Sequence, residues 1–271
     1  MDELEDRSTP KRGGIVAAIR DLDRILRGEA TRISTLRTGR IGIPAGSLSL
    51  VTIVLCMIYG VCMGTFALFK AGGPSFAQVL ASMVKVPALF ILTLIVTLPS
   101  LYVFNALLGS RLTLVSVIRL LVMSLAVNAA VLASLGPIVA FFSVSTTSYP
   151  FMVLFNVMIF AISGCLGLTF LLQTLHRLST INVQPASEAD EPLPLPDPAG
   201  GLEPLEDRLM GRETKVVFRI WLIVFGLVGA QMGWVLRPFI GNPDIPFTFF
   251  RARESNFFQE VLHLIGQLLV G

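Results

Sequence analysis

The fold is decided by an apolar stretch that begins GSLSLVTIVLCMIYGVCMGTFALF (residues 46–69) and continues to His176. It contains four long apolar runs, and a run of about 20 apolar residues is what a helix needs to cross a bilayer. A water-soluble fold could not bury so much apolar surface. The stretch therefore predicts a protein that crosses a membrane several times. Its only charged residues before Arg177 are Lys70, Lys85, Arg111 and Arg119.

The composition of the whole chain agrees with this prediction. Of the 271 residues, 54% are hydrophobic and 14% are charged, and the mean hydropathy is +0.76. Ordinary globular domains contain about 25% charged residues. The net charge of +3 and the pI of about 9.0 arise mostly from basic residues that flank the apolar runs, which indicates membrane topology rather than a nucleic-acid surface. We therefore expect the lipid bilayer, and no nucleic acid, as a partner.

The apolar runs predict an all-α integral membrane protein with five transmembrane helices. Pro99 in the second run is expected to kink its helix, and Gly136-Pro137 in the third run predicts a break near the far end. Between the first two spans, residues 76–83 have helical apolar spacing, which predicts a short interfacial helix. The expected spans are Ser47 to Phe69, Val86 to Leu108, Leu112 to Ser143, Phe151 to Leu175 and Lys215 to Leu236.

The segments outside these spans have a different composition. In the arm, residues 15–26 place apolar side chains at helical spacing among charged ones, which predicts an amphipathic helix. This helix could lie on the anionic cytoplasmic leaflet, dock on a partner or fold back under its own bundle. The predicted organisation is a cytoplasmic arm (1–45), a four-span block (46–176), a disordered acidic and Pro-rich cytoplasmic loop (177–214), a fifth span (215–236) and an outer-face tail (237–271).

The distribution of basic residues predicts the orientation. With five spans, the arm, the link between the second and third spans, and the Pro-rich loop with its flanks hold most of the 21 basic residues. Lys and Arg accumulate on the cytoplasmic side of membrane proteins. We therefore expect a cytoplasmic amino terminus and a carboxy terminus on the opposite side of the membrane.

Small residues spaced four apart predict faces where helices pack closely. Such spacing lets two helix backbones approach each other, either within one chain or between copies. Packing within the chain is preferred for the first of these steps, because GxxxG is frequent by chance in Gly-rich spans. The expected packing residues are Gly60, Gly64, Ser163, Gly167, Gly229 and Gly233.

The tail after the fifth span combines aromatic, basic and turn-forming residues. Asn256 and Gln259 form a capping pair that predicts a helix from there to Leu269, too short to span a bilayer and expected to lie on the outer leaflet or against the bundle. The simple interpretation of the tail is an interfacial anchor. The sharper hypothesis is an outer vestibule lined by basic residues with acidic counter-charges, formed by Arg237, Asp244, Arg251, Arg253 and Glu254.

No catalytic residue, cofactor site or metal site is expected from the sequence. The three cysteines lie inside apolar runs without CxxC spacing, and the two histidines fall on opposite sides in the predicted topology. We expect a non-enzymatic scaffold or subunit of a membrane complex. The alternative is an oligomeric channel or transporter, with a polar path lined by the amides Asn105, Asn128, Asn156 and Gln231.

Two short stretches, residues 26–31 (LRGEAT) and 234–239 (WVLRPF), are similar to an uncharacterised group of bacterial multi-span membrane proteins. The arrangement of five spans after a cytoplasmic arm also resembles that of the Yip1-type membrane proteins. The resemblance covers topology and implies no activity. Together with the charge bias, it implies a location in a bacterial inner membrane. Separately, the faces of small residues make a second copy or another membrane protein the expected partner.

Overall fold

The structure is a computed structural model of the chain. It describes residues 14–28, 45–69, 74–107, 114–183, 220, 223–237, 239–242, 245–251 and 255–270. Helices account for nearly all of the regular structure in these residues, and they contain no β-strand. The fold class predicted from the sequence, an all-α protein, is therefore confirmed for the described part of the chain.

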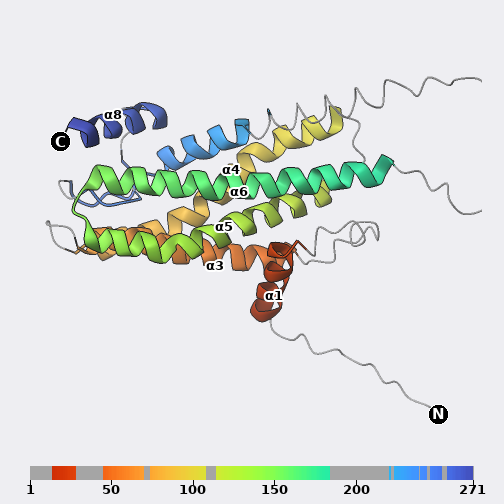
Figure 1. Ribbon diagram of the computed structural model, residues 1–271, viewed down its shortest axis with the longest axis horizontal. Helices are drawn as coiled ribbons and strands as arrows, with labels where there is room; N and C mark the ends of the chain where they lie inside the picture. The colour runs from red at the N-terminus through yellow and green to blue at the C-terminus, as the bar shows by residue number, and fades with distance from the viewer. Residues whose placement is uncertain are drawn as a thin grey trace, which may run out of the picture.

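The labelled helices follow the apolar runs closely (Figure 1). Four of them contain segments long and apolar enough to cross a membrane, namely Gly46–Leu68, Phe76–Ser100, Ile118–Ser145 and Tyr149–Thr174. This agrees with four of the predicted spans and is compatible with a membrane protein. The helices are α1 (Gly14–Leu26), α3 (Ala45–Gly64) with the 3-10 turn η1 (Thr65–Leu68), α4 (Phe76–Leu107), α5 (Leu114–Ser145), α6 (Tyr149–Val183) and α8 (Phe257–Val270).

The predicted fifth span is described only in part. A shorter apolar helix occupies Ile223–Val235, and residues 215–219, 221 and 222 lie outside the described residues. Most of the loop predicted at 177–214 also lies outside them. Its first residues belong to α6, which continues past the predicted end at Leu175 to Val183.

Two boundary predictions were wrong. The separate interfacial helix at residues 76–83 is instead the first part of α4, which runs without interruption through Pro87 and Pro99. The predicted break at Gly136-Pro137 is also absent, because α5 continues to Ser145. A proline removes one hydrogen bond, but apolar helices in a bundle tolerate this where neighbouring helices and hydroxyl side chains satisfy the freed backbone groups.

α3 is the central helix of the described bundle. It packs against α4 and against α5, while α6 packs on α5 and α8 on α6. The four long helices run side by side along the long axis of the molecule (Figure 1). One end of the bundle, where α6 begins, lies beside α8 and is called here the Tyr149 end. The other end of the bundle, toward α1, is called here the α1 end (Figure 1).

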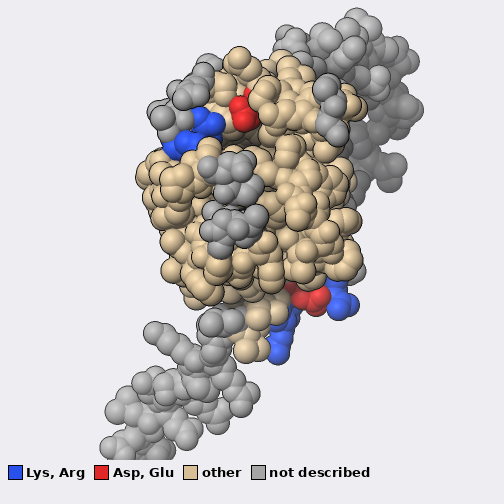
Figure 2. All heavy atoms as spheres, turned by 90° about the vertical axis from the view of Figure 1, so that its left-hand side faces the viewer, with Lys and Arg blue, Asp and Glu red and all other residues tan. Residues whose placement is uncertain are grey.

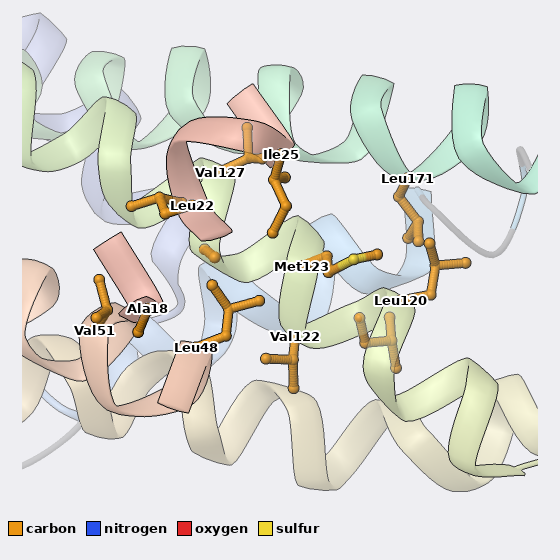
Figure 3. Packing of buried hydrophobic residues seen from close by; sticks show 12 residues of the cluster. Ala18, Leu22, Ile25, Leu48, Val51, Leu120, Val122, Met123, Val127 and Leu171 are labelled. Carbon is orange, nitrogen blue, oxygen red and sulfur yellow. The ribbon is translucent and has the colours of Figure 1, made fainter. Parts of the chain in front are cut away.

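α1 folds onto the bundle with its apolar stripe. Ala18, Leu22 and Ile25 are buried in a cluster with residues of α3 and α5. Figure 3 shows Leu22 and Ile25 near Val127 and other side chains of that cluster. Of the three arrangements predicted for this helix, the structure shows α1 folded back onto its own bundle.

Candidate functional site

Asn156 is bonded between helices. Its Oδ1 atom accepts a hydrogen bond of 2.8 Å from the Tyr59 hydroxyl of α3, and its Nδ2 atom donates one of 2.9 Å to the Met152 carbonyl of α6. Both side chains are almost completely buried. Tyr59 also packs edge-on against the ring of Phe160, with 5.4 Å between centroids. The amide therefore joins α3 to α6 inside an apolar cluster.

Asn128 lies in the contact between α5 and α6. A Cβ atom added to Gly167 would come within 3.1 Å of the Asn128 Cβ atom, so the two helices approach closely here. One turn earlier in α5, Ser124 donates a hydrogen bond of 2.8 Å to the Gly167 carbonyl. The Oδ1 atom of Asn128 is buried and accepts no hydrogen bond from any described residue.

Two of the predicted amides, Asn128 and Asn156, lie at different levels of the bundle. Gly167, which contacts Asn128, is about three turns from Asn156 along α6, or roughly 16 Å. Gln231 is half-buried on helix Ile223–Val235. The side chain of Asn105, near the end of α4, lies outside the described residues. Among the described amides, Asn156 thus bonds one helix to another, about three turns along α6 from the contact with Asn128.

The small residues predicted for packing lie in very different surroundings. Gly60 and Gly64 face α4, where added Cβ atoms would come within 2.6 Å of the Ser82 carbonyl oxygen and 2.8 Å of the Val79 Cα atom. Cβ atoms added to Gly229 and Gly233 would lie 3.7 Å from the Thr93 side chain and 3.9 Å from the Leu89 side chain of α4. The hydroxyl of Ser163, fully buried, donates to the Phe160 carbonyl of its own helix at 3.1 Å.

One face of α4 carries polar residues, and the carboxy-terminal segment covers it. Gln78 Nε2 donates a hydrogen bond of 2.8 Å to the Phe239 carbonyl, and the Ser82 hydroxyl donates to the same oxygen. Lys85 Nζ donates to the Phe249 carbonyl. These three residues follow each other at intervals of four and three, so they share one helix face. The contacts of Gly229 and Gly233 extend this interface further along α4, antiparallel to it.

Lys85 belongs to this site although no site residue was predicted at this position. The side chain was assigned to a connection between spans, whereas it is 1% exposed on α4. Its ammonium lies 4.7 Å from the ring centroid of Phe249 and 5.3 Å from that of Phe250. Cation–π contacts and a carbonyl acceptor together offset the cost of burying the charge. The spacing of Gln78, Ser82 and Lys85 is the pattern in the sequence from which this polar helix face could have been predicted.

Arg251 of the predicted vestibule lies beside Lys85, and Arg237 lies near Arg251 and Tyr149. The guanidinium of Arg237 stacks 3.8 Å above the Trp234 ring, and the Arg251 backbone N–H donates to the Arg237 carbonyl at 3.4 Å. The side chain of Arg251 interacts with both Lys85 and the Tyr149 hydroxyl. Figure 2 looks onto the Tyr149 end and shows a gathering of basic side chains with an acidic group nearby, apart from the charges of α1 at the lower edge. Asp244, Arg253 and Glu254 lie outside the described residues.

The tail helix α8 is capped as its sequence predicts. The Asn256 Oδ1 atom accepts a hydrogen bond of 2.9 Å from the backbone N–H of Gln259. α8 packs on α6 through a narrow face that includes Leu264, which is 4% exposed. The broader apolar face, with Phe258, Leu262 and Leu269, is exposed. Residues 245–250, which contain three phenylalanines, are exposed as well.

Among the described residues, no group of three or more His, Cys, Asp or Glu side chains is arranged to hold a metal ion. The free cysteines Cys56, Cys62 and Cys165 lie on α3 and α6. Comparisons of the chain with models of known protein families, with curated proteins and with solved structures give no match. The geometry of the chain itself is therefore the basis for assigning a function.

Proposed function

We propose that the protein is a non-enzymatic, multi-span membrane protein that acts as a scaffold or subunit of a membrane complex. One observation carries the proposal: buried polar side chains inside the long helices bond one helix to another at two places. Asn156 bonds to Tyr59, and Ser124 bonds to the Gly167 carbonyl. A polar path would need such groups to converge on a shared lumen. Here they fasten α3, α5 and α6 to one another.

The exposed faces of the bundle support the same proposal. α3 exposes Leu50, Val54, Ile58 and Val61 in one stripe along its length. α6 exposes Met158, Ile162 and Leu166 at the same kind of spacing. Apolar stripes of this kind face lipid or the helices of another membrane protein. Together they leave two sides of the bundle available for assembly within the bilayer.

We further propose five spans in a bacterial inner membrane, with the amino terminus in the cytoplasm and the carboxy terminus outside. Helix Ile223–Val235 supports the fifth span, because its Gly229 and Gly233 lie along α4 in the antiparallel direction. Reporter enzymes fused to the two ends test this orientation. Reporters active on the same side of the membrane would overturn the five-span arrangement.

The proposed function is tested by combining particle mass with ion flux. The protein is extracted into native nanodiscs for mass measurement, and the same protein is reconstituted into liposomes for flux. A subunit should give a particle heavier than one chain and flux no greater than that of empty liposomes. A symmetric oligomer that conducts ions would instead support the channel alternative.

Two amide variants make the test specific. Asn156→Leu removes the bond to Tyr59 and should reduce assembly and thermal stability together, because the hydroxyl is left buried without its partner. Asn128→Leu removes an oxygen that accepts no hydrogen bond from the described residues, so assembly should change little. If Asn128→Leu abolished a measured flux while the particle mass stayed the same, the scaffold proposal would be wrong.

A further inference from the structure

Three positively charged side chains come together at the Tyr149 end from separate parts of the chain. Lys85 comes from α4, Arg237 follows helix Ile223–Val235, and Arg251 lies in the segment before α8. The backbone hydrogen bond between Arg251 and Arg237 fixes their two segments side by side. Lys85 and Arg251 interact electrostatically as like charges. Like charges this close disfavour each other's charged form, so negative charge between them would be stabilising.

The described residues provide little negative charge to balance this cluster. Glu260, on α8, is the acidic residue nearby, and it accepts a hydrogen bond of 3.3 Å from the Ser255 hydroxyl. No ion pair joins Arg251 to an acidic residue in the described part of the chain. The Nε atom of Arg251 is buried, and no described residue accepts a hydrogen bond from it. A buried donor on a cation that finds no acceptor among the described residues is costly, so a ligand that supplies oxygen atoms and negative charge would bind favourably here.

The surroundings of Arg251 define the chemistry of that ligand. A guanidinium matches the geometry of a phosphate with two parallel hydrogen bonds, and the Tyr149 hydroxyl lies beside it as a further polar group. Trp234 donates through Nε1 to the Ser255 carbonyl at 2.6 Å, which holds an indole beside the cluster. Trp is enriched at the level of lipid headgroups. We infer that the Tyr149 end binds a phosphate group through Arg251, with Lys85 and Arg237 supplying further positive charge. This inference does not depend on the scaffold proposal.

The phosphate could come from a lipid headgroup or from a free phosphate compound, and two binding measurements separate these sources. In the first, the full-length protein is purified in detergent, and phosphatidylglycerol is titrated while native mass spectrometry records the lipid-bound fraction. In the second, inorganic phosphate is titrated into the delipidated protein, and the shift in melting temperature is recorded. Saturable binding in the lipid arm alone would assign the site to a headgroup. Saturable binding of inorganic phosphate would assign it to a free phosphate compound.

The variants Arg251→Gln and Arg251→Lys test the residue, and Arg20→Gln is the matched control. Arg20 is exposed on α1, far along the bundle from the site. We expect at least tenfold weaker phosphate binding in Arg251→Gln, a smaller loss in Arg251→Lys and no change in Arg20→Gln. Arg251→Lys keeps the charge and loses the planar fork, so it decides the question if Arg251→Gln does not fold. The inference is overturned if the wild type binds neither probe, or if Arg251→Lys and Arg20→Gln both bind like the wild type.

Discussion

Two GxxxG steps in this chain have the same sequence spacing, and both face α4, but they approach it at different distances. Gly60 and Gly64 lie where α3 meets α4, and an added Cβ atom at either would come within 2.8 Å or less of the α4 backbone. Gly229 and Gly233 also face α4, but added Cβ atoms there would meet side-chain carbons at 3.7 and 3.9 Å. Contacts below 3.0 Å require a backbone to move, whereas contacts near 3.7 Å are ordinary van der Waals distances.

The difference shows that two helices can be attached to α4 by different means. The α3–α4 contact depends on the absence of side chains, because the two backbones come as close as sterics allow. The carboxy-terminal segment depends on polar contacts, since Gln78, Ser82 and Lys85 all donate to its carbonyl oxygens. Small residues are therefore essential in the first contact and dispensable in the second.

The largest expected effect is that of Gly60→Ala, which would break the first contact. The new methyl group would lie 2.6 Å from the Ser82 carbonyl oxygen and 2.8 Å from the Met83 Cα atom. Overpacking of this kind costs about 3 kcal/mol when backbone must shift. Unfolding of the purified protein by titration with a denaturing detergent, followed by circular dichroism, measures the loss. Gly46→Ala is the control, because nothing lies within 4 Å of its added Cβ atom; equal stability of both variants would contradict the close contact.

The next effect concerns the polar attachment. Lys85→Met keeps the length of the side chain but removes the hydrogen bond to the Phe249 carbonyl and both cation–π contacts. We expect the free energy needed to detach the segment around Phe249 from α4 to fall by about 2 kcal/mol, while α3 and α4 stay packed. Limited trypsin digestion after Arg251 should therefore become faster. Val84→Met, at an exposed neighbouring position, should leave the digestion rate unchanged; a wild-type rate in Lys85→Met would show that the lysine does not hold the segment.

The sequence predicts the long helices well and their boundaries less well. A run of some 20 apolar residues has one stable conformation in a bilayer, so the spans from α3 to α6 follow from hydropathy alone. The start of α4 does not, because Lys85 and Pro87 have the pattern of a span boundary. Only the structure shows that the charge of Lys85 is accommodated by the carbonyl and rings of a segment distant in sequence.

Contacts between residues close in sequence could be predicted at the candidate sites, whereas contacts between distant segments could not. The pair Asn256 and Gln259 is local, so the cap of α8 follows from spacing alone. Whether Asn156 lines a path or bonds to Tyr59 depends on which helix lies opposite, and neither hydropathy nor spacing encodes that neighbour. The GxxxG pattern has the same limit, because it describes one surface of a contact and not the distance to the other.

Gly167→Ala is expected to have an effect between those of Gly60→Ala and Gly229→Ala. In Gly167→Ala the new methyl group would lie 3.1 Å from the Asn128 Cβ atom and 3.2 Å from the Ser124 carbonyl oxygen. Small shifts can relieve such contacts, so we expect a loss of about 1 kcal/mol in the same unfolding titration. Gly164→Ala, almost one turn earlier in α6, is the control because its surroundings are open. A loss in Gly167→Ala as large as that in Gly60→Ala would mean that these distances do not determine the cost.

The smallest effect is expected for Gly229→Ala. Its added Cβ atom would lie 3.7 Å from the Thr93 Cγ2 atom, which creates contact without overlap. Alanine also favours a helix over glycine by up to about 1 kcal/mol, so stability should be unchanged or slightly higher than in the wild type. The unfolding titration used for Gly60→Ala measures both variants under one condition. A destabilisation of Gly229→Ala comparable to that of Gly60→Ala would mean that the carboxy-terminal helix packs on α4 as closely as α3 does, and the distinction between packed and polar attachment would fail.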